Sequence, residues 1–312
     1  MVSDWKPVSV LLLLSLLWAM ETAQSELLPG LVATDDGVRF PPLARRALFF
    51  AILAAVEGVV AALSASKRTG WFVGWKDLLR NFGVGVGLFA VPVFVAHTAG
   101  NQVSAYSRTA LFTLVPVFAI VFQPYISPCA GVPSRFSLLA ALAATSGAFC
   151  IFPVELPSSA GSGVAFVLVI AAAASIGAAS CLAAEMTASR PVAPVATIAA
   201  TGAALVFAAA SGVLERRGGS EGWSDWPWML ILELPALLLL FLLFPRLSPV
   251  RMATRYLMAP LFAVLMGVFV EHPHLELRGI FGMLLMAAAS GYLLFAGKSD
   301  NSDGQPASFV PR

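Results

Sequence analysis

Three glutamates lie inside stretches of sequence that are otherwise apolar. Glu57 is in "AILAAVEGVVAAL", Glu233 is in "WMLILELPALLLL", and Glu21 follows "LLLLSLLWAM". A charged side chain at the centre of a membrane helix costs about 2.5–3.5 kcal/mol on insertion scales, so such groups normally face a cavity or a partner. A carboxylate taken out of water favours its protonated form, which suits a proton- or cation-coupling site. The alternative is a structural role, in which the carboxylate pairs with an arginine or caps a helix.

Two arginines stand near the start of long apolar stretches. Arg108 is in "SRTALFTLVPVFAIVF" and Arg255 is in "TRYLMAPLFAVLMGVF". A guanidinium group there could hold a carboxylate or a phosphate through two parallel hydrogen bonds. It could equally neutralise Glu21 or Glu57, or extend along its helix to the lipid headgroups. Both arginines are therefore candidate contacts for an anionic group of a substrate.

Aromatic side chains accompany these charges. Tyr106 and Tyr256 flank the two arginines, and Trp18 precedes Glu21 in the first apolar stretch. Their rings could line a substrate cavity by stacking, and their polar atoms could form hydrogen bonds with a ligand. The alternative is that they anchor their helices at the membrane interface, where Trp and Tyr are enriched.

The composition supplies the apolar helices that must position these residues. The chain is 59% hydrophobic and 12% charged, with a mean hydropathy of +0.85, whereas an average soluble protein is about 25% charged. A membrane span takes about 20 helical residues. We therefore predict an all-α polytopic membrane protein with ten transmembrane helices, near residues 8–28, 43–65, 78–98, 102–124, 135–154, 162–186, 193–213, 227–245, 249–270 and 276–297.

The two ends of the chain and its short loops predict an orientation. The segment 8–28 also has the form of a secretory signal peptide, but no small-residue cleavage site follows it, which favours a retained helix. Most Lys and Arg residues fall in the segments that lie on the same side as the N-terminus, and such residues favour the cytoplasmic side. We therefore expect both termini in the cytoplasm, a position in the plasma (inner) membrane, and a disordered cytoplasmic tail over 298–312.

One phrase of the sequence occurs twice. Pro116 and Phe118 recur 144 positions later as Pro260 and Phe262, and Ser146-Gly147 recurs at the same spacing as Ser290-Gly291. The alternative is coincidence in a restricted apolar alphabet. A duplicated unit of five helices predicts two repeats, over 1–154 and 155–297, inserted in opposite directions because five is odd. Inverted repeats of this kind are typical of secondary transporters, whose substrate sites lie between the repeats.

The stretches "ALFTLVPVFAIVF" and "YLMAPLFAVLMGVFVEHPHLELRGIFGMLLMAAASGYLLF" give the chain a resemblance to a known family. With the opening "LLSLLWAMETA", it resembles the EamA-type members of the drug/metabolite transporter superfamily. The resemblance implies ten helices in two five-helix repeats, and export or exchange of amino acids or related metabolites. The chain departs from the family pattern at "FQPYISPCAGVP", where a glutamate turn is expected, and in the long segment 29–42.

These observations predict a secondary active transporter, an exporter or exchanger, that moves a small metabolite by alternating access. The metabolite would be an amino acid or a related organic solute, anionic solutes included, with protons as a coupling ion. Alternatives are a multidrug or lipid-linked substrate exporter or flippase on the same fold, and a membrane subunit or receptor without transport activity. The sequence has no P-loop, nucleophile elbow or H-E-x-x-H motif, so we expect no enzyme and no cofactor. The net charge of +2 does not favour a nucleic-acid partner.

If Glu57 is the leading coupling residue, Glu57→Gln removes the group that takes up the proton. We expect a pH gradient to drive solute accumulation in proteoliposomes of the wild type, and accumulation by the variant to fall to its level without a gradient. A variant that responds to the gradient as the wild type does would remove the coupling role.

Overall fold

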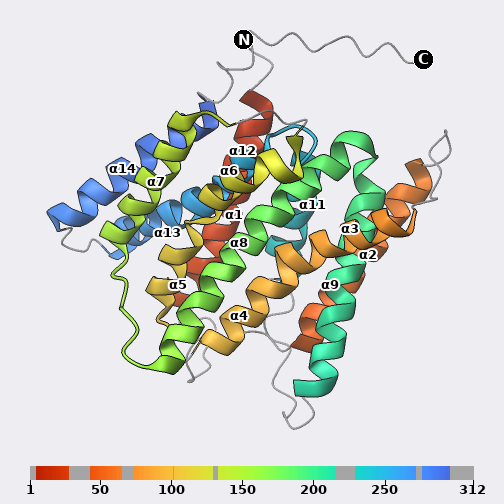
Figure 1. The fold of residues 1–312 in the computed structure, drawn as a ribbon, viewed down its shortest axis with the longest axis horizontal. Helices are drawn as coiled ribbons and strands as arrows, with labels where there is room; N and C mark the ends of the chain where they lie inside the picture. Colours follow the sequence, from red (N-terminus) through yellow and green to blue (C-terminus); the bar gives the residue numbers. More distant parts are fainter. Residues whose placement is uncertain are drawn as a thin grey trace.

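The computed structural model describes residues 5–27, 43–64, 74–100, 102–128, 133–214, 229–271 and 276–295, and every regular element in these ranges is a helix (Figure 1). The expected tail over 298–312 and the side chain of Glu21 lie outside the described part of the chain. The elements are α1 (Trp5–Leu27), α2 (Leu43–Ser64), α3 (Trp75–Gly85), η2 (Val86–Ala90), α4 (Val91–Ala99), α5 (Ala105–Phe112), α6 (Val115–Ile126), α7 (Arg135–Ile151), α8 (Ala160–Ser189), α9 (Val192–Leu214), η4 (Met229–Glu233), α11 (Leu234–Leu243), α12 (Pro249–Ala253), α13 (Arg255–Glu271) and α14 (Leu277–Phe295).

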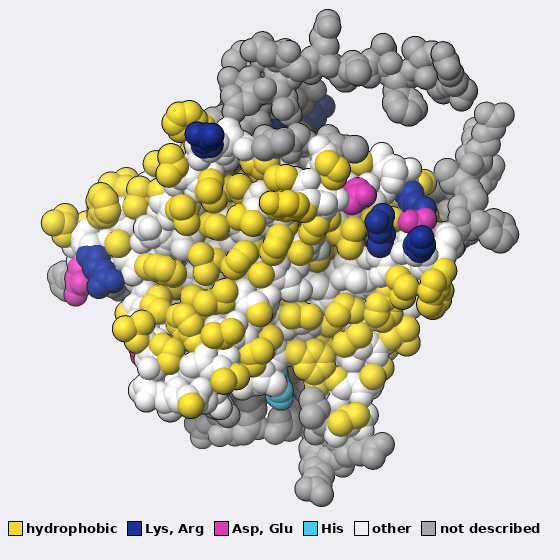
Figure 2. Space-filling view, viewed as in Figure 1, with side chains coloured by type: hydrophobic (Ala, Val, Ile, Leu, Met, Phe, Trp, Pro, Cys, Tyr) yellow, Lys and Arg dark blue, Asp and Glu magenta, His cyan; other side chains and the backbone are white. Residues whose placement is uncertain are grey.

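The helices fit a multi-pass membrane protein. Seven stretches in the described ranges are long and apolar enough to cross a membrane: Leu43–Leu63, Trp75–Ala99, Ala105–Ile126, Ala160–Ser189, Val192–Val213, Pro249–Phe269 and Leu277–Phe295. The other three expected spans correspond to shorter apolar helices, at Lys6–Met20, Arg135–Ile151 and Leu230–Leu243. Figure 2 shows apolar side chains across the middle of one face, with Lys and Arg at its edges. The count of ten spans stays a prediction.

The helices pack in pairs that join distant parts of the sequence. α2 lies along α9 and α7 along α14, while α8 packs against α6 and α13 against α1. Figure 1 shows α7 and α14 side by side at one edge of the molecule, and α2, α3 and α9 at the other. Aromatic rings fill the second group: Phe50 stacks on Phe207 at a centroid distance of 5.5 Å and contacts Phe89 at 4.9 Å.

Two helices contain a widened π-helical turn just before a proline. η2 ends two residues before Pro92, and η4 ends two residues before Pro235. Proline lacks the N–H that would bond the carbonyl four residues earlier, and its ring clashes with that carbonyl. In both helices that carbonyl belongs to the π-helical turn, and the wider turn relieves the clash. The two prolines lie 143 positions apart.

The two stretches that carry the repeated phrase each contain a break where the sequence predicted one continuous helix. α5 is separated from α6 at Thr113, whose hydroxyl donates to the carbonyl of Ala110 at 2.6 Å. α12 is separated from α13 at Thr254, whose hydroxyl donates to the carbonyl of Arg251 at 2.5 Å. A threonine hydroxyl that takes a backbone carbonyl in this way bends its helix. Each stretch also begins with a serine N-cap, at Ser104 and at Ser248, with 144 positions between them.

The packing of α3 against α9 depends on a glycine. A Cβ atom at Gly85 would lie 1.8 Å from the carbonyl oxygen of Ala199 and 2.6 Å from its carbonyl carbon. Both contacts are with backbone atoms, which cannot move aside as a flexible side chain would. The backbones of α3 and α9 therefore come into direct contact, as small residues allow in membrane helices.

We expect Gly85→Ala to lower the free energy of unfolding by about 1–3 kcal/mol or more, because the added methyl group overpacks the contact with Ala199. Gly83 is the matched control, since nothing lies within 4 Å of its Cβ position. Gly83→Ala should be neutral or stabilising, because alanine favours a helix more than glycine does. Thermal unfolding of the purified variants in detergent measures both effects. Equal losses at the two positions would contradict the proposed contact.

Candidate functional site

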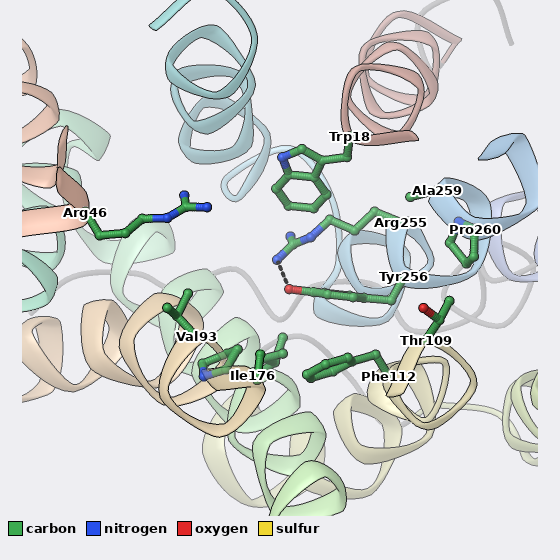
Figure 3. A pocket seen from close by; sticks show the side chains of 12 residues that line it. Trp18, Arg46, Val93, Thr109, Phe112, Ile176, Arg255, Tyr256, Ala259 and Pro260 are labelled. Atoms are coloured by element: carbon green, nitrogen blue, oxygen red, sulfur yellow. Dashed lines mark hydrogen bonds between the residues drawn. The ribbon is translucent and has the colours of Figure 1, made fainter. Parts of the chain in front are cut away.

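A cavity of about 300 Å³ lies among α1, α2, α4, α5, α8 and α13. Its volume falls at the lower end of the range for small-molecule sites, which is about 300–1,000 Å³. Apolar and aromatic side chains form most of the wall, and arginine supplies its only charges among the described residues. The lining residues are Trp18, Arg46, Pro92, Val93, Ala96, Thr109, Phe112, Ile176, Arg255, Tyr256, Ala259 and Pro260 (Figure 3).

Arg255, the first residue of α13, brings a positive charge into this cavity. The residue is only 1% exposed. Its guanidinium carbon lies 5.0 Å from the centre of the Trp18 ring and 4.8 Å from the centre of the Tyr256 ring. One terminal nitrogen, Nη2, donates to the hydroxyl of Tyr256 at 3.3 Å. Figure 3 shows the guanidinium held between the two rings, with its end turned toward the cavity.

The partners of Arg255 leave its charge without a counterion among the described residues. Its Nε and Nη1 atoms are buried and have no hydrogen-bond partner there. Contact with aromatic faces offsets about 2 kcal/mol when the cation is desolvated. Burial of a charge costs several kcal/mol even after the protein relaxes. Free donors on a desolvated guanidinium favour an anionic partner such as a carboxylate or a phosphate.

A second arginine, Arg46, lines the cavity from the first turn of α2 and points into it from the side opposite Pro260 (Figure 3). Its Nη1 atom forms an ion pair with Oε1 of Glu233, the last residue of η4. The side chains are 13% and 11% exposed, so water screens this pair weakly. The structure thus places Glu233 next to the cavity, held by an arginine.

The other residues predicted to bind substrate lie elsewhere. Arg108 donates through Nη1 to the carbonyl of Ala96 at 3.0 Å, near the C-terminal end of α4, where a cation is favourable. Tyr106 is 54% exposed and stacks on Phe152 at a centroid distance of 6.4 Å. Neither residue lines the cavity. Of the five predicted residues, the structure brings together Trp18, Arg255 and Tyr256.

Glu57 is buried, on the same side of α2 as Phe50 and Leu53, and it does not line the cavity. It lies 11 residues beyond Arg46 in the same helix, which corresponds to about 16 Å along the axis. Within the described part of the chain it makes no ion pair or side-chain hydrogen bond. The neighbouring Gly58 faces Thr197 of α9. Its role in ion coupling stays a prediction.

Arg46 and Phe112 are lining residues that the sequence reasoning did not single out. Arg46 follows Arg45 at the start of an apolar stretch, a pattern typical of an ordinary flanking charge. Phe112 could have been identified from the sequence, because it precedes Pro116 by four positions just as Tyr256 precedes Pro260. An alignment of the two proline stretches therefore predicts an aromatic residue at the cavity from each.

A group of ion pairs lies away from the cavity, where α3 meets the connection between α8 and α9. Arg190 pairs with Asp77 of α3, and each side chain is 29% exposed. Arg80 and Glu185 are 3.9 Å apart and more exposed. α2 crosses the molecule once between its own start and the start of α3, so these pairs lie at the opposite end from Arg46. No group of His, Cys, Asp and Glu suited to a metal ion occurs in the described ranges.

No protein-family model and no curated protein matches this chain. A solved structure described only as "Crystal structure of protein" is similar to it in fold, with a TM-score of 0.72. The two sequences are 16% identical, and the match covers 93% of this chain and 99% of the other. At that level of identity the likeness shows the fold alone.

We expect Arg108→Gln to lower the free energy of unfolding by about 1–3 kcal/mol, because the variant loses a charged hydrogen bond at the end of α4. If the chain is the transporter that its sequence predicts, transport by the folded variant should stay close to the wild-type rate. Thermal unfolding and solute flux, measured on the same preparation, separate the two effects. A large loss of flux with unchanged stability would instead return Arg108 to the substrate site.

Proposed function

We propose that this chain is a secondary active transporter and that the cavity around Arg255 binds its substrate. The observation that carries the proposal is a buried guanidinium, two of whose nitrogens have no partner among the described residues, turned into a cavity in a bundle of apolar helices. Ionisable residues inside membrane bundles are rare and mark substrate or ion pathways. A subunit without transport activity would have no need to keep such a charge unpaired.

The proposed architecture is ten transmembrane helices in two inverted repeats of five, over 1–154 and 155–297. Three local features support it, because each has a counterpart in the other half at almost the same spacing. Serine caps start α5 and α12, π-helical turns precede Pro92 and Pro235, and aromatic residues at the cavity precede Pro116 and Pro260. The start of α1 and the end of α14 also lie at the same end of the molecule, as an even number of spans requires (Figure 1).

The helix pairs fit the same symmetry. If α1 to α7 form one repeat and α8 to α14 the other, the pairs α2–α9 and α7–α14 each join equivalent helices across the two repeats. The pairs α1–α13 and α8–α6 are then equivalent to each other. The cavity lies between the halves, with α8 and α13 on one side and α1, α2, α4 and α5 on the other. Rocking of the halves about this site would expose it to each side of the membrane in turn.

The proposed substrate is a small organic solute with an anionic group, such as an amino acid or a related carboxylate. Its anionic group would bind Arg255, and its apolar part would pack against Trp18, Phe112 and Ile176. The positive charge of the cavity argues against organic cations, and hence against the multidrug alternative. A volume of about 300 Å³ argues against the lipid-linked alternative, because a long chain would not fit.

Within this proposal, the plasma membrane is the location and both termini face the cytoplasm. The ion pairs of Asp77 and Arg80 would then close the cytoplasmic end, and they must separate when the cavity opens to that side. Glu57 remains the leading candidate for proton coupling. An EamA-type transporter of the drug/metabolite superfamily is the family we propose.

The test is solute counterflow in proteoliposomes made with the full-length protein and a panel of labelled amino acids and monocarboxylates. We expect at least one member to exchange, and Arg255→Gln to lower its rate at least tenfold, because the substrate loses its charged partner. Arg278→Gln is the matched control, since Arg278 is exposed and donates to the carbonyl of Phe149 outside the cavity. Equal rates for Arg255→Gln and the control would overturn the assignment of the site.

A further inference from the structure

The cavity contains two cationic positions, and they are not equivalent. Arg46 has a carboxylate partner, Glu233, whereas Arg255 has only the Tyr256 hydroxyl and two aromatic faces among the described residues. A carboxylate is thus already present beside Arg46, whereas the position beside Arg255 has no anion among the described residues.

The contact of Glu233 with Arg46 uses only part of the carboxylate. Oε1 accepts from Arg46, while Oε2 is buried and has no hydrogen-bond partner among the described residues. Glu233 is 9% exposed, so bulk water does not supply the hydrogen bonds that Oε2 lacks. The pair therefore lacks the bidentate geometry that is the stronger form of an arginine–carboxylate contact. Glu233 therefore occupies, at the edge of the cavity, the position beside Arg46 that another anion could take.

We propose that Glu233 acts as an internal anion that fills the second anion position of the cavity and restricts the substrate to a single negative charge. The inference rests on the proposed transport function. A monocarboxylate would bind Arg255 and leave the Arg46–Glu233 pair intact. A dicarboxylate would have to displace Glu233 from Arg46, and the displaced carboxylate would then be buried without a partner, which is strongly unfavourable.

Hexanoate and adipate provide a direct test, because they have the same number of carbon atoms and differ by one carboxylate. Their affinities are measured by calorimetric titration of the full-length protein in detergent. We expect the wild type to bind hexanoate at least tenfold more tightly than adipate. Glu233→Gln should raise the affinity for adipate at least tenfold and change that for hexanoate less than threefold, because the anion position beside Arg46 is no longer filled by a carboxylate. Glu155→Gln, which makes the same change at an exposed position, should alter neither.

The outcomes separate this inference from the proposed function. If Arg255→Gln abolishes hexanoate binding but Glu233→Gln gains no affinity for adipate, the role of Glu233 is overturned and the substrate site stands. If Arg255→Gln binds hexanoate as the wild type does, the assignment of the substrate site to Arg255 fails.

A second variant keeps the inference open to refutation if Glu233→Gln does not fold or if neither acid binds. Glu233→Ala removes the carboxylate and leaves room for a small acid beside Arg46. We expect acetate to raise the thermal unfolding temperature of Glu233→Ala in a concentration-dependent manner, and to have a smaller effect on the wild type and on Glu155→Gln. The same response to acetate in all three proteins would show that the position beside Arg46 is not an anion site, and would overturn the inference.

Discussion

A guanidinium group enclosed by apolar helices needs compensation for its charge, and the structure around Arg255 follows from that requirement. Two aromatic rings and one phenol hydroxyl cover the cation, but they are neutral and leave two of its nitrogens without partners in the described part of the chain. Aromatic faces offset a desolvated cation only in part. An anion in the proposed substrate site would complete the compensation, and the relief of the unfavourable buried charge would then contribute to its binding free energy.

Interrupted helices make this arrangement possible. An unbroken α-helix bonds its own carbonyl groups and offers few changes of direction within an apolar bundle. Here prolines remove backbone donors, π-helical turns widen the helix before two of them, and threonines bend the stretches that contain the other two. The breaks let α5 and α13 present Phe112 and Tyr256 to one cavity. In the same way, the turn at η4 brings Glu233 against Arg46.

The positions of the helices could be predicted closely from the sequence, because a membrane requires about 20 apolar residues in each span and loops interrupt the pattern. The site was only partly predictable. Trp18, Arg255 and Tyr256 are exceptional within apolar sequence, whereas Arg46 looks like a flanking charge, and its partner Glu233 is 187 residues away. Successive residues of a helix point about 100° apart, so Arg108 turns away from the cavity that Thr109 and Phe112 line. The direction in which a side chain points, and its pairing with a residue distant in the sequence, can be read only from the folded structure.

The ion pairs at the two ends of the molecule differ in their contact with solvent. Arg190 and Asp77 are each 29% exposed, whereas Arg46 and Glu233 are 13% and 11% exposed. Dissolved ions screen charges over a Debye length of about 8 Å at physiological concentration, and they weaken exposed pairs far more than enclosed ones. A rise in ionic strength therefore loosens the contact of α3 with the α8–α9 connection and leaves the contact of α2 with η4 nearly unchanged. The salt concentration on one side of the bilayer therefore affects the strength of the ion pairs at one end of the protein more than at the other.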